Sequence, residues 1–522
     1  MGRCVRIVDK KKIKAYFQTA GGTAVACAFV LGMFTHMYAL TNNLHNYDDI
    51  AIQPAGYGTG IVLGRWLLTM LGDAADMAGV GYNLPFVNGV LFILLLSICA
   101  GLLVSLFEIE NRVCAGLVGA LFVTFPTAAS TMFFRYTAVY YGLGILLAVL
   151  AAWVLRRYKY GLLLSALCTA LSMGIYQAYA PLTIGIFVLM LIRQALKEDA
   201  DAKKLVLGGL YDCAALGLGA ALYFLLLKAA QAAYGTGLLE YQGVASMGNL
   251  SLAQLPGLIV RAFTSYCALP FRDCYGIAPR KIIRLLYLLL WLATAVLIVY
   301  LLGKKVKKPL VRVFFCLIWL IFPVAVNFIV IMCPDGWIYT IMAYSFSLVL
   351  CAPVVLLEGL LQGTAKSWSG ILAKAAGLLV AVIVLYNAYY TNINYTAMYF
   401  ANRQVENYLN SIVVQIRVTE GFDADKQWAL LGEIEDPLLE SPWEDMANYG
   451  GNYFTGRLLN QYSRNNWIQS YFGYRVPAVS EEKAAQLWQT EEVKVMPCWP
   501  SEGSIRVIGD TVVVKFQEAP QE

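Results

Sequence analysis

Residues 20–50, AGGTAVACAFVLGMFTHMYALTNNLHNYDDI, contain the pattern that decides the fold. The part from 20 to 41 is almost entirely apolar, and about 20 such residues let a helix cross a bilayer. The chain then turns polar and places Asp48 beside Asp49. A basic segment, MGRCVRIVDKKKIKAYFQ, comes first, and the apolar run lacks a small-residue cleavage site. We therefore expect an uncleaved first membrane helix followed by an acidic loop.

The composition of the whole chain agrees with a membrane protein. Of its 522 residues, 59% are hydrophobic and 14% are charged, whereas soluble domains have about 25% charged residues. A soluble fold could not bury so much apolar surface, so the composition predicts an α-helical polytopic membrane protein. The net charge of +6 is spread over short clusters between apolar runs, which does not indicate a nucleic-acid-binding surface.

Hydropathy predicts about eleven transmembrane helices. Their approximate ranges are 20–41, 83–107, 112–130, 136–155, 161–178, 180–196, 205–228, 282–302, 311–333, 337–361 and 370–391. Pro181 lies between the two least separated spans, where it indicates either a tight hairpin or a kink. The segment 58–72 contains Arg65 and is too short to cross, so we expect it to form a helix in the membrane interface.

The basic residues predict the orientation of these helices. They concentrate in alternate loops, at 3–14, 156–159, 197–204, 304–308 and 366. We therefore expect the N-terminus inside and the C-terminus outside, in the cell (inner) membrane. The outer side then carries two long loops, 42–82 and 229–281, and the whole C-terminal tail.

The tail differs in composition from the rest of the chain. It predicts two domains, a transmembrane domain over 1–394 and a small extracytoplasmic α/β domain over 395–522. Four segments, QWALLGEI, VKVM, SIRVIG and TVVVKF, are typical of strands, and helical patterns lie near 402–418 and 480–490.

Asp48, Asp49 and Arg65 are the first candidates for chemistry. A carboxylate at a membrane surface can serve as a general base or hold a metal ion on a phosphate. The alternative is a solvated loop or a helix N-cap. An arginine on an apolar segment needs a carboxylate or phosphate partner, unless its side chain reaches up to the lipid headgroups.

Further candidates lie at the predicted outer ends of other spans. Arg135, among aromatic residues, fits either a phosphate clamp or an interfacial aromatic belt. Tyr176 and Gln177 could bind sugar hydroxyls or satisfy neighbouring backbone groups. Arg272 in the second long loop is a weaker phosphate-binding candidate, and His45 lies close enough in sequence to assist the aspartates.

Several classes of protein are not indicated. The chain has no phosphate-binding GxxxxGK[ST] loop, no GxGxxG after a strand, no GxSxG and no HExxH. Its Cys and His spacing does not suggest zinc. The predicted spans are poor in acidic residues, unlike those of many proton-coupled transporters.

The motifs NYDDI, GRWLL, FFRYTAVYYG and GIYQAYAPL, and the tail MPCWPSEGSIRVIGDTVVVKF, resemble those of the GT-C glycosyltransferases. Within that class the chain is most similar to the bacterial Gtr type II glucosyltransferases, the O-antigen glucosyltransferases and their relatives. The resemblance implies a polyprenyl-phosphate sugar as donor, with glucose as the sugar. It implies a surface glycan or lipid as acceptor and an active site on the outer face.

The resemblance also implies roles for the candidate residues. Asp48 or Asp49 would be the general base of an inverting displacement, with Asp48 favoured and Asp49 orienting Arg65 or the loop. The donor phosphate would be bound by Arg65, Arg135 and Arg272. The substrates would be positioned by Tyr176, Gln177 and His45. No cofactor is required, although Mg²⁺ or Mn²⁺ held by Asp48 stays open.

Two other functions stay open at this point. A flippase or exporter of lipid-linked glycans would share the many spans, but it should show a polar path to the cytoplasmic side. An O-antigen polymerase or ligase would use arginines in a large outer loop, for which 229–281 is available. The acidic first loop favours the glucosyltransferase.

Overall fold

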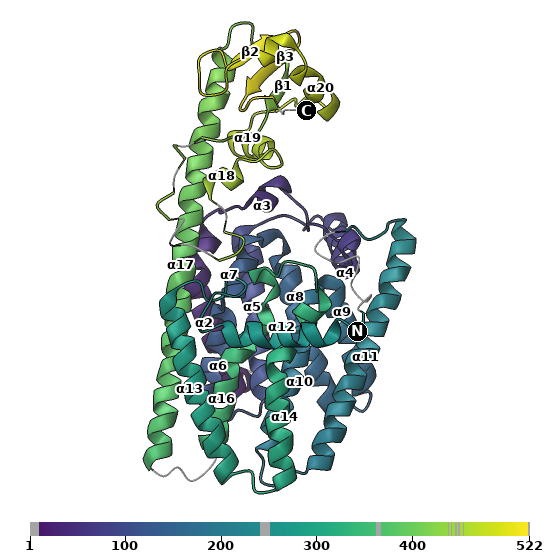
Figure 1. Cartoon of the computed structure of the whole chain (residues 1–522), viewed down its shortest axis with the longest axis vertical. Coiled ribbons are helices and arrows are strands. Elements are labelled where there is room, and N and C mark those ends of the chain that lie inside the picture. Colours follow the sequence, from purple (N-terminus) through teal and green to yellow (C-terminus); the bar gives the residue numbers. More distant parts are fainter. Residues whose placement is uncertain are drawn as a thin grey trace.

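The computed structural model shows a helical bundle with a small sheet held beyond one of its ends (Figure 1). It describes residues 10–240, 251–361, 367–436 and 438–519, except 440, 444, 445, 447, 448 and 453. The basic residues before position 10, residues 241–250 of the second long loop and Lys366 lie outside the described residues.

Ten helical segments in the described part of the chain are long and apolar enough to cross a membrane, which makes this a multi-pass membrane protein. They are α2 (Ala20–Thr41), α5 (Pro85–Leu106), α6 with α7 (Arg112–Thr124, Pro126–Phe133), α8 (Arg135–Arg157), the 3-10 turn η2 with α10 (Gln177–Tyr179, Ala180–Ala195), α11 (Ala202–Tyr234), α13 (Lys281–Lys304), α14 (Pro309–Val326), η4 with α16 (Tyr344–Phe346, Ser347–Leu361) and α17 (Ser367–Val418). The eleventh predicted span corresponds to the shorter apolar helix α9 (Gly161–Ile175). Sequence hydropathy therefore located every one of these segments.

The junction between α9 and α10 determines where the site can form. Helix α9 has 15 residues, which is about 22 Å and shorter than the hydrocarbon core of a bilayer. It ends because Tyr176 adopts an extended conformation, and Pro181 then lies in the first turn of α10, where its missing N–H costs nothing. Tyr176 and Gln177 are thus placed inside the bundle rather than at its rim.

Short helices occupy the end of the bundle that faces the sheet (Figure 1). The first long loop forms α3 (Tyr47–Ala51), the 3-10 turn η1 (Ile61–Leu63) and α4 (Trp66–Met77). The interfacial helix predicted over 58–72 therefore begins only at Trp66, and Arg65 is its N-cap residue. The remaining short helices of the membrane region are α1 (Lys10–Phe17), α12 (Leu255–Ala268), α15 (Ile329–Met332) and η3 (Thr340–Met342).

Helix α17 connects the membrane region to the C-terminal domain. Its 52 residues span about 78 Å, far more than the 30 Å core of a bilayer. The two helical patterns predicted separately at 370–391 and 402–418 belong to this one helix, which also passes the predicted domain boundary at 394/395. Figure 1 shows it rising along the bundle to the sheet.

The C-terminal domain contains a three-stranded sheet of order β1-β3-β2. Strand β1 (Gln427–Leu431) is parallel to β3 (Thr511–Lys515), and β2 (Ile505–Ile508) is antiparallel to it. Three of the four predicted strands are confirmed. The fourth, VKVM, is wrong, because its first two residues complete α21 (Glu491–Lys494), which Thr490 caps by accepting from Val493 N–H. The other helices of the domain are α18 (Thr455–Leu458), α19 (Arg464–Phe472) and α20 (Glu481–Trp488).

The core of the C-terminal domain includes a residue of the first long loop. Ile50 of α3 is fully buried in the same cluster as Val405 and Leu409 of α17 and Trp467 of α19. Asn466 Nδ2 also donates to the Ala51 carbonyl at 2.8 Å. The domain and the acidic loop are therefore packed as one body over the end of the bundle.

Candidate active site

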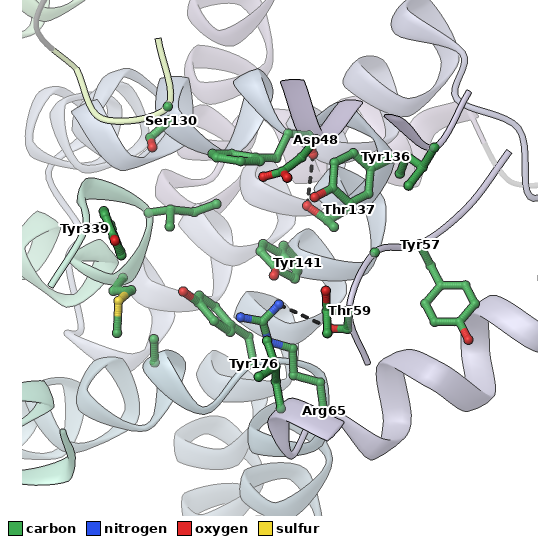
Figure 2. Close-up of a pocket in the computed structure, with 18 of the residues that line it drawn as sticks. Asp48, Tyr57, Thr59, Arg65, Ser130, Tyr136, Thr137, Tyr141, Tyr176 and Tyr339 are labelled. Carbon is green, nitrogen blue, oxygen red and sulfur yellow. Dashed lines mark hydrogen bonds between the residues drawn. The ribbon is translucent and has the colours of Figure 1, made fainter. Parts of the chain in front are cut away.

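A cavity of about 820 Å³ lies between the end of the bundle and the C-terminal domain. Its wall is formed by α3, the loop from α3 to Arg65, the start of α8, the α9–η2 junction, the segment after α15 and the C-terminal domain. Its polar and aromatic lining includes Tyr47, Asp48, Tyr57, Thr59, Arg65, Ser130, Tyr136, Thr137, Tyr141, Tyr176, Gln177, Tyr339 and Tyr462. Figure 2 shows Asp48 and Arg65 on opposite sides, with Tyr141 between them.

Helix α3 separates the two aspartates. It begins because the Asn46 side chain accepts from Asp49 N–H at 2.8 Å, while Asn46 Nδ2 donates to the Phe133 carbonyl at 2.9 Å. Successive helical residues point in directions about 100° apart, because a turn has 3.6 residues. Asp48 therefore lines the cavity, whereas Asp49 points into the protein and is fully buried.

Asp49 belongs to a buried ion pair with Arg135. Its Oδ2 accepts from Arg135 Nε at 3.1 Å and from Nη2 at 2.8 Å, and its Oδ1 accepts from Asn83 Nδ2 at 3.0 Å. Burial alone would raise the pKa of Asp49, but Arg135 and the hydrogen bonds outweigh it, so the pKa lies below its ordinary value. Asp49 was suggested to orient Arg65. In the structure the arginine that bonds Asp49 is Arg135.

His45 completes this buried cluster. Its Nδ1 accepts from Arg135 Nη2 at 2.9 Å and lies 3.2 Å from Asp49 Oδ2. Burial, followed by the charge of Arg135, lowers the pKa of His45 to about 4 against the pull of Asp49, so the ring is neutral at pH 7. Trp467 and Tyr471 of α19 make edge-to-face contacts with it. His45, Asp49 and Arg135 thus connect the first loop to α8 and to the C-terminal domain, and none of them lines the cavity.

Arg65 turns its guanidinium group toward the cavity. Its Cζ lies 4.7 Å from the centre of the Tyr176 ring, and Nη1 donates to the Thr59 carbonyl at 3.4 Å. In the described part of the chain no carboxylate forms an ion pair with it, and its Nε is buried without a partner. Tyr141 stacks on Tyr176 with ring centres 4.8 Å apart. The cation therefore lies against the face of Tyr176, and it can bind an anion in the cavity.

A tight turn presents Arg65. Gly64 has φ +75°, and a Cβ there would lie 2.5 Å from Gln177 Nε2 and 2.7 Å from the Tyr223 hydroxyl oxygen. The Tyr223 hydroxyl donates to the Gly64 carbonyl at 3.0 Å, and Gln177 Nε2 donates to the Leu63 carbonyl at 2.7 Å. Gln177 thus lines the cavity but uses its amide nitrogen to hold this turn. Tyr223 of α11 was not predicted, because it lies within an apolar span.

Asp48 differs from Asp49 in its pKa as well as in its position. Burial, with the neighbouring charge of Asp49, raises the pKa of its carboxyl to about 6, while Arg65 lowers it. A carboxylate with this pKa is ionised at pH 7 and accepts a proton more readily than an ordinary aspartate. Its position in the cavity wall and its raised pKa therefore distinguish Asp48 from the buried Asp49. The sequence alone could not distinguish them.

Most of the membrane region matches a known family. Residues 37–350 match the family model described as Glucosyl transferase GtrII. The chain belongs to this family. Searches of curated proteins and of solved structures gave no match. The resemblance to the Gtr type II glucosyltransferases is therefore confirmed, and it makes the protein a membrane-embedded glycosyltransferase.

The GtrII match covers only part of the cavity. Asp48, Arg65 and Tyr176 lie inside the matched range, whereas Tyr462 and the other lining residues of the C-terminal domain lie beyond it. Arg272, the remaining predicted phosphate ligand, is exposed in the turn after α12 and does not line the cavity.

Within the described ranges, no group of three or more His, Cys, Asp and Glu side chains could hold a metal ion. Asp49 and His45 are engaged with Arg135, so Asp48 is the acidic group that the first loop offers to the cavity. This arrangement can remove a proton at one wall and stabilise negative charge at the other.

Proposed function

We propose that this protein transfers glucose from a polyprenyl-phosphate donor to a hydroxyl group of a surface glycan or lipid. The family supports glucosyl transfer, and the geometry supports the type of donor. The observation that carries the proposal is that Asp48 and Arg65 lie on opposite sides of one cavity at the end of the membrane bundle. The first can serve as a base and the second as an anion-binding group.

The reaction is a single displacement with inversion. Asp48 removes the proton of the acceptor hydroxyl as its oxygen attacks the anomeric carbon of the donor sugar. The bond between that carbon and the phosphate oxygen breaks, and its electron pair leaves with the oxygen. The products are a glucosylated acceptor, polyprenyl phosphate and a proton on Asp48, which is released to water.

Arg65 stabilises the leaving group. Negative charge grows on the phosphate in the transition state, and a fixed cation at that point lowers the barrier. The guanidinium is suited to this task because no carboxylate among the described residues forms an ion pair with it. It is held in place by Tyr176 and Thr59. In this proposal the polyprenyl chain remains in lipid while the phosphate enters the cavity.

The other predicted residues act indirectly in this scheme. Tyr176 and Gln177 position Arg65, through ring stacking and through the Gly64 turn. His45, Asp49 and Arg135 fix α3 and so hold Asp48 toward the cavity. We assign no role to Arg272.

We propose that the reaction requires no metal ion, because a phosphate is already a fair leaving group and Arg65 supplies the positive charge. The competing proposal is a Mg²⁺ or Mn²⁺ ion on Asp48. We propose that the site faces the extracytoplasmic side of the cell membrane, and the distribution of basic residues among the loops supports this orientation. Polyprenyl-linked donors and surface acceptors are both compatible with that side.

The test of the donor site is a comparison of two arginine variants in vesicles. Arg65→Gln should lower kcat/KM for polyprenyl-phosphate glucose by about 10²–10³-fold, the usual cost of one transition-state donor. Arg112→Gln is the control, because Arg112 is exposed, bonds Thr23 and does not line the cavity. Full activity of Arg65→Gln would show that Arg65 does not bind the donor phosphate.

A further inference from the structure

Part of the cavity wall belongs to the C-terminal domain. Gly450, Gly451 and Tyr462 line the same cavity as Asp48, although they lie far beyond the family match at 37–350. The domain therefore contributes surface to the reaction site itself. This surface can contact either the donor or the acceptor of the proposed reaction.

The domain is fixed against the bundle at this point. Ser130 Oγ donates to the Gly450 carbonyl at 2.5 Å, and Gly450 N–H donates to Thr340 Oγ1 at 3.1 Å. A Cβ on Gly450 would lie 2.7 Å from Thr340 Oγ1, and one on Gly451, which has φ +97°, would lie 2.7 Å from Phe134 Cε2. Only glycine allows so close an approach. These contacts hold the wall in a defined position.

Tyr462 presents an unusually open aromatic ring to the cavity. Its side chain is 59% exposed, and it meets Tyr47 edge to face with ring centres 6.3 Å apart. Burial, followed by the charge of Asp48, raises the pKa of Tyr462. A large aromatic surface left open beside a polar group is typical of a ligand contact.

The two ends of the cavity differ in chemistry. Arg65, Tyr141 and Tyr176 form a cationic and aromatic end, which the donor phosphate occupies in the proposed function. The acceptor hydroxyl must reach Asp48, so the body of the acceptor lies at the end that contains Asp48 and Tyr462. A pyranose ring has an apolar C–H face and polar edges, so it can cover an aromatic ring while its hydroxyls face a carboxylate.

We propose that Tyr462, with Tyr47 and the backbone of Gly450–Gly451, forms a subsite for a sugar ring of the acceptor. This inference rests on the proposed glucosyl transfer and deepens it, because it makes the acceptor a glycan. The C–H face of the pyranose lies on the Tyr462 ring, and its hydroxyl donates its proton to Asp48. The C-terminal domain thereby determines acceptor affinity.

The experiment uses the full chain in vesicles with labelled polyprenyl-phosphate glucose. Methyl pyranosides of glucose, galactose and mannose serve as acceptor probes, next to polysaccharide extracted from the envelope of the cells that make the protein. Tyr462→Ala, Tyr462→Phe and the control Tyr474→Ala are compared with wild type. Tyr474 belongs to the same domain and bonds Arg417, but it does not line the cavity.

The expected result is a separation of the two Michaelis constants. Tyr462→Ala should raise KM for the sugar acceptor about 5- to 10-fold, as the loss of one aromatic contact implies, and change KM for the donor less than about two-fold. Tyr462→Phe should stay close to wild type, because the ring is kept. Tyr474→Ala should change neither constant. Because Tyr462 is exposed, its truncation leaves no hole in the core.

Other outcomes would overturn the inference. An unchanged KM for the acceptor in Tyr462→Ala would show that Tyr462 does not form an acceptor subsite. An equal rise of the Michaelis constants for donor and acceptor would show the same. Transfer to lipid without transfer to any sugar probe would show that the acceptor is not a glycan. If wild type consumes no donor under any condition, the proposed function itself fails, and the subsite fails with it.

Discussion

The adjacent aspartates should respond in opposite ways to the same substitution. In Asp49→Asn, Arg135 loses its partner in a site where neither side chain is exposed. Removing one member of a buried ion pair costs about 3–5 kcal/mol of unfolding free energy. In Asp48→Asn, the cavity loses its base, which should lower kcat by about 10²–10⁴-fold. The fold should not weaken, because burial raises the pKa of Asp48 and its charged form is therefore disfavoured in the folded state.

The assay measures stability and turnover on the same purified samples. Unfolding is followed in mixed micelles, and turnover is reported per folded molecule. The double variant Asp49→Asn/Arg135→Gln should recover part of the lost stability, because it no longer leaves a buried charge unpaired. The reasoning is refuted if Asp49→Asn unfolds like wild type, or if Asp48→Asn keeps more than about a tenth of the activity, well above the range for a lost general base.

Four further results are expected. Gly64→Ala should lower donor kcat/KM by at least about ten-fold, since a Cβ would collide with Gln177 and Tyr223; a variant with wild-type donor kinetics would show that the turn is not needed. The rate should fall as pH drops through about 6, where Asp48 becomes protonated. In Arg65→Gln the residual activity should fall at a higher pH than in wild type, because Arg65 lowers the pKa of Asp48. A rate that is constant from pH 5 to 8 would contradict both expectations. EDTA should leave turnover unchanged, whereas loss restored by Mg²⁺ or Mn²⁺ would favour the metal alternative. A reporter fused to the C-terminus should be active only outside the cell, and cytoplasmic activity would reverse the proposed orientation.

The membrane helices could be predicted because the bilayer imposes a length and an apolar composition on each one. Their order and approximate ends follow from hydropathy alone. The prediction from hydropathy was less accurate where a helix packs against other parts of the protein instead of lipid. Asp212 lies within α11, although the predicted spans are poor in acidic residues, and it forms an ion pair there with Arg156 at 2.6 Å. The two patterns that form α17 were separated for the same reason. Asn394, which lies between them, bonds the C-terminal domain, and Asn402, at the start of the second pattern, bonds the first loop.

The structure brings together only half of the predicted site residues. Asp48, Arg65, Tyr176 and Gln177 line one cavity, whereas Asp49, His45, Arg135 and Arg272 do not line it. The partner of Asp49 lies 86 positions along the chain, and one sequence carries no signal for such a pair. Tyr462 was missed because only the return of the chain after α17 brings it to the cavity.

The most direct test of the account is turnover of labelled polyprenyl-phosphate glucose by wild type and Asp48→Asn, reconstituted with an envelope extract as acceptor source. The account predicts that wild type moves the label to the acceptor and releases polyprenyl phosphate, while folded Asp48→Asn does neither at a comparable rate. Equal turnover by the two proteins would show that Asp48 is not the base. The absence of label transfer by wild type, with this donor and every acceptor tried, would contradict the proposed reaction.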